Sequence, residues 1–312
     1  WRTDVEERKP LTPVLRFNGD PLDDDLERSL RSLRVELSVR RPGVVRLVYE
    51  DPTRGLFSRL PFKVTDQLEV LVPGRRNDLV SVFTGDITGL GVHDAEGLSE
   101  IRVEAHDARH RFALSSRVTA HLEKSAIEVV RDIAIAHGLA LQTTLESTTE
   151  AWLLQRGTDF AFLNEVAVTH GADWYVDGHN LHLVPEREEE PVTVSYETGS
   201  LRRFSANHTS SKAVAEVEVR GWDPASQKAI VATAKTEPKE DHLGSGADFV
   251  ASQFREGQKE WGRTVQISSI QVRSQAEAER VAKALAARWS AAGLSVEGEA
   301  FSSPELRPGR RV

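Results

Sequence analysis

Strict alternation of apolar and polar residues dominates the first third of the chain. The alternation covers residues 35–39 and 45–49, and Pro42-Gly43 lies between them. A period of two places every second side chain on one face, as in a half-buried strand, and the Pro-Gly pair predicts a turn that makes a hairpin. Further strands are expected at 62–72, 79–90 and 100–106. Residues 14–112 are therefore expected to form a first antiparallel β-barrel or sandwich.

The period changes to that of a helix after residue 113. Ser125 and Glu128 form a Ser-x-x-Glu capping box, apolar residues follow at helical spacing, and Gly138 is expected to end the helix. A second helix is expected at 159–170, ending at Gly171. A hairpin should follow around Asp177-Gly178. Residues 113–190 are therefore expected to form a small α/β domain.

Alternation returns at Val192 and Val194 and recurs at 217–219 and 230–232, which predicts a second β-barrel over 191–273. Residues 236–262 are expected to form a long mobile loop in it. A helix should start at Ser274, where Ser274 and Glu277 form another Ser-x-x-Glu capping box, and close at Gly293, within a last segment, 274–312. The pattern of residues 101–108 resembles that of 217–224, which indicates either duplicated barrels or a chance likeness between strands. The predicted fold class is α+β, mainly β, with two antiparallel β-barrels, the inserted α/β domain and a C-terminal helix.

The charge balance and two absent residue types limit the function classes. The chain has 48 acidic and 40 basic residues, a net charge of −8, so tight nucleic-acid binding is not expected. No apolar run is long enough for an integral membrane segment. Cysteine is absent, which excludes disulfides and thiolate metal sites. Methionine is also absent, so the chain is expected to be a fragment or a processed product, with residues 1–13 as an extended lead-in.

Two groups of residues have the types that bind metals. His106 and His110 are four residues apart, as on a zinc-protease helix, but Asp107 does not supply the required Glu and the segment follows a strand. We expect a strand end with a hydrogen-bonded Asp there. A second, acidic group has the residue types of a calcium site but lacks the alternate-ligand spacing of a calcium-binding loop. We expect it to begin a helix. It consists of Asp20, Asp23, Asp24 and Asp25.

Other short patterns do not assemble into a catalytic site. Gly89-Leu90-Gly91 lacks the third glycine of a dinucleotide loop, and Asn207-His208-Thr209 matches a glycosylation acceptor only as a three-residue pattern. His137 and His170 each precede a helix-ending glycine and are expected to interact with the helix dipole. No catalytic, cofactor or metal residue is predicted, and the chain is not expected to be an enzyme. A hydrolase using scattered carboxylates or His106 and His110 remains an alternative.

The order of motifs resembles the phage late-control D and valine–glycine-repeat (VgrG) hub family, over roughly residues 14–312. Phe112 departs from the family pattern, which usually has Leu there. The motifs that carry the resemblance are Phe83-Thr84-Gly85-Asp86-Ile87, Asp107-Ala108-Arg109-His110-Arg111-Phe112, Gln155-Arg156-Gly157-Thr158-Asp159 and Val219-Arg220-Gly221-Trp222-Asp223.

The resemblance implies a structural baseplate hub of a contractile injection machine or a phage tail. Each subunit would supply two tube-protein-like barrels, so that a homotrimer presents a pseudo-six-fold ring. The implied partners are the inner tube protein above, a spike domain or PAAR-type tip below, and baseplate wedge proteins. The particle would be assembled in the bacterial cytoplasm and could be released. Residues 306–312 resemble the junction to a spike domain. A β-rich binding module such as a tail-associated adhesin is the alternative.

Overall fold

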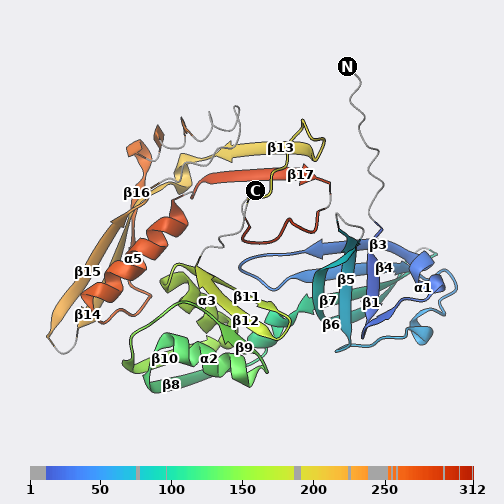
Figure 1. The fold of residues 1–312 in the computed structure, drawn as a ribbon, viewed down its shortest axis with the longest axis horizontal. Coiled ribbons are helices and arrows are strands. Elements are labelled where there is room, and N and C mark those ends of the chain that lie inside the picture. Colours follow the sequence, from blue (N-terminus) through green and yellow to red (C-terminus); the bar gives the residue numbers. More distant parts are fainter. Residues whose placement is uncertain are drawn as a thin grey trace.

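Three hydrophobic cores follow one another along the chain in the computed structural model (Figure 1). The first lies at residues 15–105, the second at 112–183 and the third at 214–286. No helix among the described residues combines the length and apolar character that crossing a bilayer requires. The structure describes residues 12–74, 78–95, 97–185, 191–223, 226–237, 252–253, 256–257, 259–290, 292–301, 303–310 and 312.

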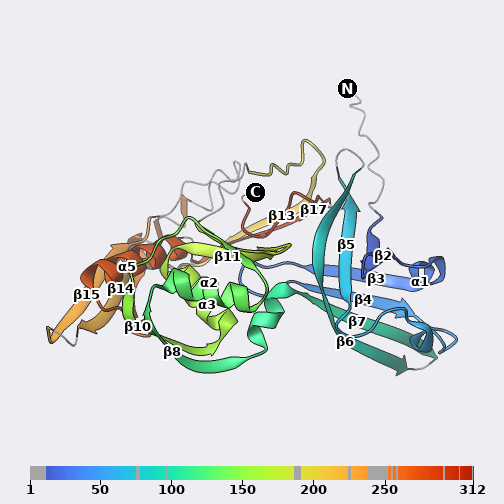
Figure 2. The same cartoon turned by 60° about the horizontal axis from the view of Figure 1, so that its bottom comes forward.

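The first core is enclosed by a seven-stranded sheet in the order β2-β1-β5-β6-β7-β4-β3, in which every pair is antiparallel. The sheet curls strongly, so that β5 lies at a steep angle to β3 and β4, while the long β6 pairs with β5 and then with β7 (Figure 2). Its elements are β1 (Val14–Phe17), β2 (Asp20–Pro21), α1 (Asp24–Ser29), β3 (Leu30–Glu36), β4 (Val44–Glu50), η1 (Phe57–Arg59), β5 (Gln67–Pro73), β6 (Leu79–Ala95) and β7 (Leu98–Asp107).

The hairpin predicted around Pro42-Gly43 is confirmed, with β3 paired to β4. Leu37 and Val39, in the second half of the alternating segment 35–39 that was predicted to be a strand, lie instead in the connection after β3. Hydrogen bonds hold this connection away from the ladder: the Gly43 amide donates to Asp107 Oδ2 (2.6 Å), and Arg109 donates to the Val39 carbonyl (3.2 Å). The connection is therefore bound to the end of β7.

The second core lies between two helices and two small sheets. Both hydrogen bonds of the capping box predicted at Ser125 are present, and Gly138 and Gly171 have positive φ at the helix ends, so these predictions are confirmed. β8 pairs with β10, and β11, β12 and β9 form the other sheet, with β12 and β9 parallel. The elements are η2 (Ala108–Ala113), β8 (Ser116–Lys124), α2 (Ala126–Ala136), β9 (Ala140–Gln142), β10 (Glu150–Thr158), α3 (Asp159–Thr169), β11 (Ala172–Asp177) and β12 (Asn180–Pro185).

The third core forms where the sheet β15-β14-β16 packs on one face of α5. Val217 and Val219 of β14 are fully buried there, as expected for a wall facing a core. Strands β13 and β17 form a separate two-stranded ribbon, which runs above the second unit in Figure 1. The elements are β13 (Leu201–His208), η3 (Ser210–Lys212), β14 (Val214–Asp223), β15 (Lys228–Lys235), β16 (Arg263–Ile267), α5 (Gln275–Trp289) and β17 (Leu294–Ala300).

The predicted α+β, mainly β fold, with helices between and after the β segments, is confirmed, but strand pairing in the third unit differs from an antiparallel barrel. β14 and β16 run parallel. Two parallel strands cannot be joined by a tight hairpin turn, and β15 and residues 236–262 separate β14 from β16 in the sequence. β7, by contrast, has two antiparallel neighbours. The similar patterns at 101–108 and 217–224 therefore lie in strands with different neighbours.

Two further expectations differ in detail. Residues 191–200 contain no strand, because side-chain hydroxyls of Ser195 and Ser200 take part in a local turn, and the strand begins at Leu201. Ser274 caps α5, but Glu277 bonds back to the Arg273 amide (2.9 Å), so the reciprocal capping box is not formed there. The lead-in at 1–13 and the loop at 236–262 lie largely outside the described residues, and the domain boundaries stay predictions.

Candidate functional site

The two histidines with zinc-like spacing each bond to structural neighbours. His106 Nδ1 lies 2.7 Å from Thr88 Oγ1, and His110 Nδ1 lies 2.8 Å from the Asp107 carbonyl oxygen. The ring centroids are 6.0 Å apart. Within the described part of the chain, no three His, Asp or Glu side chains gather where they could hold a metal ion. Residues 106–110 therefore lie at and just after the end of strand β7, where the sequence predicted a strand end.

Asp107 links three parts of the first unit. Its carboxylate accepts the Arg109 amide (3.0 Å) at the start of η2 as well as the Gly43 amide. The Arg109 guanidinium, on a residue only 6% exposed, donates to Asp107 Oδ2 (2.8 Å) and to the Ser38 carbonyl (2.9 Å). Arg111 forms a bidentate pair with Asp86, at 2.7 and 2.6 Å. The motif that resembles the hub family thus fastens β7 to the β3–β4 connection and to β6.

The remaining sequence candidates are also placed by the fold. The acidic helix start is confirmed, because Asp23 caps α1 by accepting the Leu26 amide (2.8 Å) and Asp24 and Asp25 occupy its first turn, whereas Asp20 lies in β2. Gly89-Leu90-Gly91 lies inside β6 and forms no phosphate loop. Asn207 is an exposed residue of β13. These residues lie in different elements and form no common site.

The two helix-end histidines behave differently from the dipole partners expected. His170 Nδ1 lies 2.8 Å from the Val166 carbonyl in the last turn of α3, so the imidazole donates there. Burial, with the positive charge of Arg280, lowers the pKa of His170, so the ring is neutral at pH 7 and supplies no charge to the dipole. His137 turns its ring away from the end of α2. It stacks on Phe112, with centroids 4.0 Å apart, and its Nε2 lies 3.1 Å from Asp159 Oδ2.

Asp159 is the centre of a buried polar network that sequence reasoning missed. Its side chain has no exposed surface. Oδ2 accepts from Arg117 (2.6 Å) as well as facing His137, and Oδ1 accepts from Gln155 Nε2 (2.7 Å). Gln155 Oε1 in turn lies 3.1 Å from His121 Nε2. The network joins β8, the end of α2, β10 and the start of α3.

This network stabilises the fold. The Asp159 carboxylate accepts hydrogen bonds at both oxygens, from Arg117 at Oδ2 and from Gln155 at Oδ1. A buried carboxylate needs such compensation to remain charged. The signal in the sequence was the Gln155-x-x-x-Asp159 spacing, which places both side chains near the first turn of α3. Periodicity could not show that Arg117, 42 residues earlier, completes the pair.

A second charged cluster joins the second and third units. Arg273, just before α5, donates to the Glu150 carboxylate and to the Trp152 carbonyl, and its Cζ lies 4.0 Å from the centre of the Trp152 ring. Arg280 of α5 donates to the Thr169 carbonyl (2.5 Å). Burial, with the negative charge of Glu277, raises the pKa of Glu150. These contacts hold α5 against β10 and α3.

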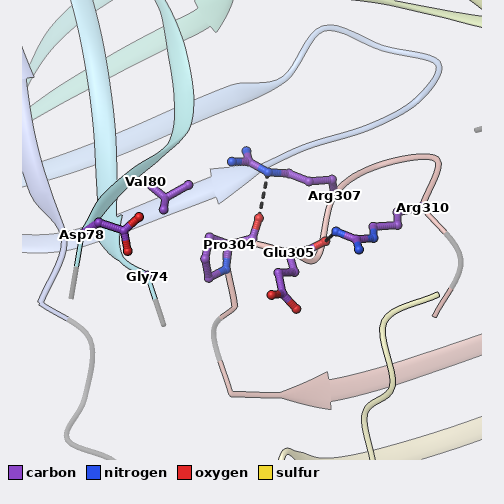
Figure 3. Close-up of a pocket in the computed structure, with 7 residues that line it drawn as sticks. All are labelled: Gly74, Asp78, Val80, Pro304, Glu305, Arg307 and Arg310. Carbon is purple, nitrogen blue, oxygen red and sulfur yellow. Dashed lines mark hydrogen bonds between the residues drawn. The ribbon is translucent and has the colours of Figure 1, made fainter. Parts of the chain in front are cut away.

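The C-terminal segment lies against the first unit. Arg307 Nη1 donates to the Val82 carbonyl of β6 (2.9 Å), and Nη2 donates to the Ser81 carbonyl. A hollow of about 490 Å³ opens between this segment and the β5–β6 hairpin (Figure 3). It contains no paired nucleophile and base. Its lining residues are Gly74, Asp78, Val80, Pro304, Glu305, Arg307 and Arg310.

Solved structures of tail proteins share this fold. The tail protein of Neisseria meningitidis MC58 is 13% identical, with a TM-score of 0.62 over 92% of this chain and 79% of that one. The 43 kDa tail protein of prophage MuSo2 from Shewanella oneidensis is 12% identical, with a TM-score of 0.59 over 87% of this chain and 77% of that one. A chain of the Francisella PdpA–VgrG complex is 10% identical, with a TM-score of 0.50 over 89% of this chain and 43% of that one.

Comparison of the sequence with family models identifies one family. No curated protein matches the sequence. A family model described as the Alg8 N-terminal domain matches residues 12–306, which include all three cores. The late-control D and VgrG resemblance is thus supported at the level of the tail-protein fold, while the matching family model has a different name. The chain belongs to the Alg8 N-terminal domain family.

Proposed function

We propose that this chain is a structural hub subunit of a contractile injection machine or phage tail. Three copies form a ring with pseudo-six-fold symmetry, which joins the inner tube above to a three-fold spike or PAAR-type tip below and contacts baseplate wedge proteins. The observation that supports this most is the fold shared with two tail proteins over most of the chain. The function is mechanical, and we propose that it involves no catalysis.

The arrangement of the units supports the proposal. Two β units flank an α/β unit, and the first and third units each leave a strand edge unpaired in the described part of the chain. Open edges invite further strand pairing, and a closed ring of copies would cover them. The net charge of −8 also suits a conduit, because a wall without excess basic charge does not retain a polyanion through counterion release.

Light scattering after size exclusion, combined with particle averaging, tests the proposal. We expect three times the monomer mass and a three-fold collar with a central channel. A monomer throughout the micromolar range would contradict the ring and favour the alternative of a tail-associated binding module. In the assembled particle, we expect the collar at the base of the tube. We propose that assembly takes place in the bacterial cytoplasm and that finished particles can be released.

A further inference from the structure

Two strand edges on this chain are long and open. β3 ends the seven-stranded sheet, and β17 is one of the two edges of the β13–β17 ribbon. Each strand has seven residues. No backbone hydrogen bond within the described ranges reaches the outer side of either strand. A two-stranded ribbon is only marginally stable alone in water, so the β13–β17 ribbon needs a further strand or a covering layer.

The ribbon has one apolar face and one polar face. The register pairs Ala206 with Val296 and Leu201 with Ala300 on the apolar face. Val296 remains 43% exposed, so nothing described covers this face fully. On the polar face of β17 lie Glu297 and Glu299, both exposed. The outer edge of β17 therefore alternates between small or branched apolar residues and carboxylates.

The open edge of β3 alternates in the same way, and its outer face carries Arg34 as well as Glu36. Leu33 and Val35 lie opposite the fully buried Leu47 and Val45, so they point toward the core of the sheet. Arg34 points to the outer face, and its side chain is 75% exposed. Its ion pair with Glu36 is exposed on both sides and contributes little. The outer face of this edge can therefore receive a carboxylate.

We propose that β17 of one copy adds to the open edge of β3 in a second copy. The apolar face of the ribbon then continues the inner face of the curled sheet, and Glu297 and Glu299 lie on the same face as Arg34. Cross-strand pairs of opposite charge stabilise such a junction, and the backbone hydrogen bonds supply the affinity. The inference rests on the proposed ring and names the contact that closes it.

Charge disfavours two other edge combinations. β17 against β17 opposes carboxylates, and β3 against β13 opposes Arg34 to Arg202 and Arg203. β17 against β13 of another ribbon is compatible in charge but repeats without closing, which produces a filament. The pairing of β17 with β3 joins two different units head to tail, which is the kind of contact that a closed ring of three copies requires.

Cysteine cross-linking can test the contact because the chain contains no cysteine. In the variant Arg34→Cys with Glu297→Cys, we expect a short bismaleimide to produce covalent dimers and trimers on a reducing gel. The matched control is Arg34→Cys with Asn207→Cys, which places the second thiol on the same face of the ribbon but on β13. Cross-linking of the control in place of the first variant would overturn the proposal.

Charge reversal provides an independent measurement. Glu297→Arg should raise the dissociation constant of the assembly at least tenfold in sedimentation equilibrium, and adding Arg34→Glu should restore part of the loss. Circular dichroism should show the same fold in both variants. A trimer that neither cross-links nor responds to charge reversal would overturn the strand contact and leave the ring intact. A monomer that does not cross-link would contradict both the strand contact and the ring. Cross-linked species of more than three copies would support the strand contact and contradict the ring.

Discussion

The guanidinium of Arg117 lies 2.6 Å from the carboxylate of Asp159, which has no exposed surface. Replacing Asp159 by Ala leaves the buried Gln155 amide without its acceptor, whereas Arg117, whose side chain is 44% exposed, keeps access to water. We expect the free energy of unfolding to fall by about 1–3 kcal/mol. Urea denaturation followed by circular dichroism measures the change.

The control for Asp159→Ala is Asp132→Ala, which breaks the exposed pair between Lys124 and Asp132. An exposed pair of this kind contributes at most about 1 kcal/mol. Equal losses in the two variants would contradict the importance of the buried network.

Two glycines of β6 should respond differently to the same substitution. A Cβ on Gly85 would lie 2.2 Å from the His106 carbonyl oxygen, whereas a Cβ on Gly91 would have no atom within 4 Å. Because a backbone oxygen cannot yield easily, Gly85→Ala should destabilise the chain by about 1–3 kcal/mol or more. Gly91→Ala should be neutral or stabilising, since it reduces the freedom of the unfolded chain. Thermal unfolding of both variants checks this, and a loss of stability at Gly91 alone would contradict it.

The hydroxyl of Tyr49 is buried and has no hydrogen-bond partner in the described structure. Burial also raises its pKa. Tyr49→Phe removes an unsatisfied polar atom and keeps the ring packed against Phe62, with centroids 6.4 Å apart. We expect unchanged stability or a gain of about 1 kcal/mol, within the range for an unpaired buried group. A loss above that value in chemical denaturation would show that the hydroxyl has a partner.

His170 should make stability depend on pH below neutrality. Its pKa is lowered by burial and by Arg280, so between the folded pKa and the unfolded value of about 6.5 the unfolded chain binds more protons. Stability should therefore be independent of this group above pH 7 and fall as the pH falls from 6.5 toward the folded pKa. In His170→Asn, the slope of unfolding free energy against pH should be smaller over that interval. Identical slopes in both proteins would contradict the assignment.

Local signals in the sequence were enough for the helix and hairpin ends. Ser125, Gly138 and Gly171 act within one turn of the residues that they cap, so pattern and propensity suffice to place them. The hairpin at Pro42-Gly43 follows from a turn and an alternation that are both contiguous in the chain. The strand predicted from the alternating valines at residues 191–195 was wrong, because these valines precede a turn stabilised by side-chain hydroxyls.

Contacts between distant residues depended on the tertiary structure. Asp159 and Arg117 are 42 residues apart, and β14 pairs in parallel with β16, which follows β15 much later in the sequence. His137 was expected at a helix dipole, but the fold brings Asp159 to its ring. Such contacts depend on how elements pack, and periodicity reports only which face of an element is apolar.

By itself, the sequence determined that this chain is mainly β with a helical insert, because alternation, capping boxes and turn glycines act over a few residues. Only the tertiary structure decided which strands became neighbours, which polar side chains were buried together and which strand edges remained open. These outcomes depend on contacts between segments far apart in the chain, where the burial of many apolar side chains outweighs any local preference.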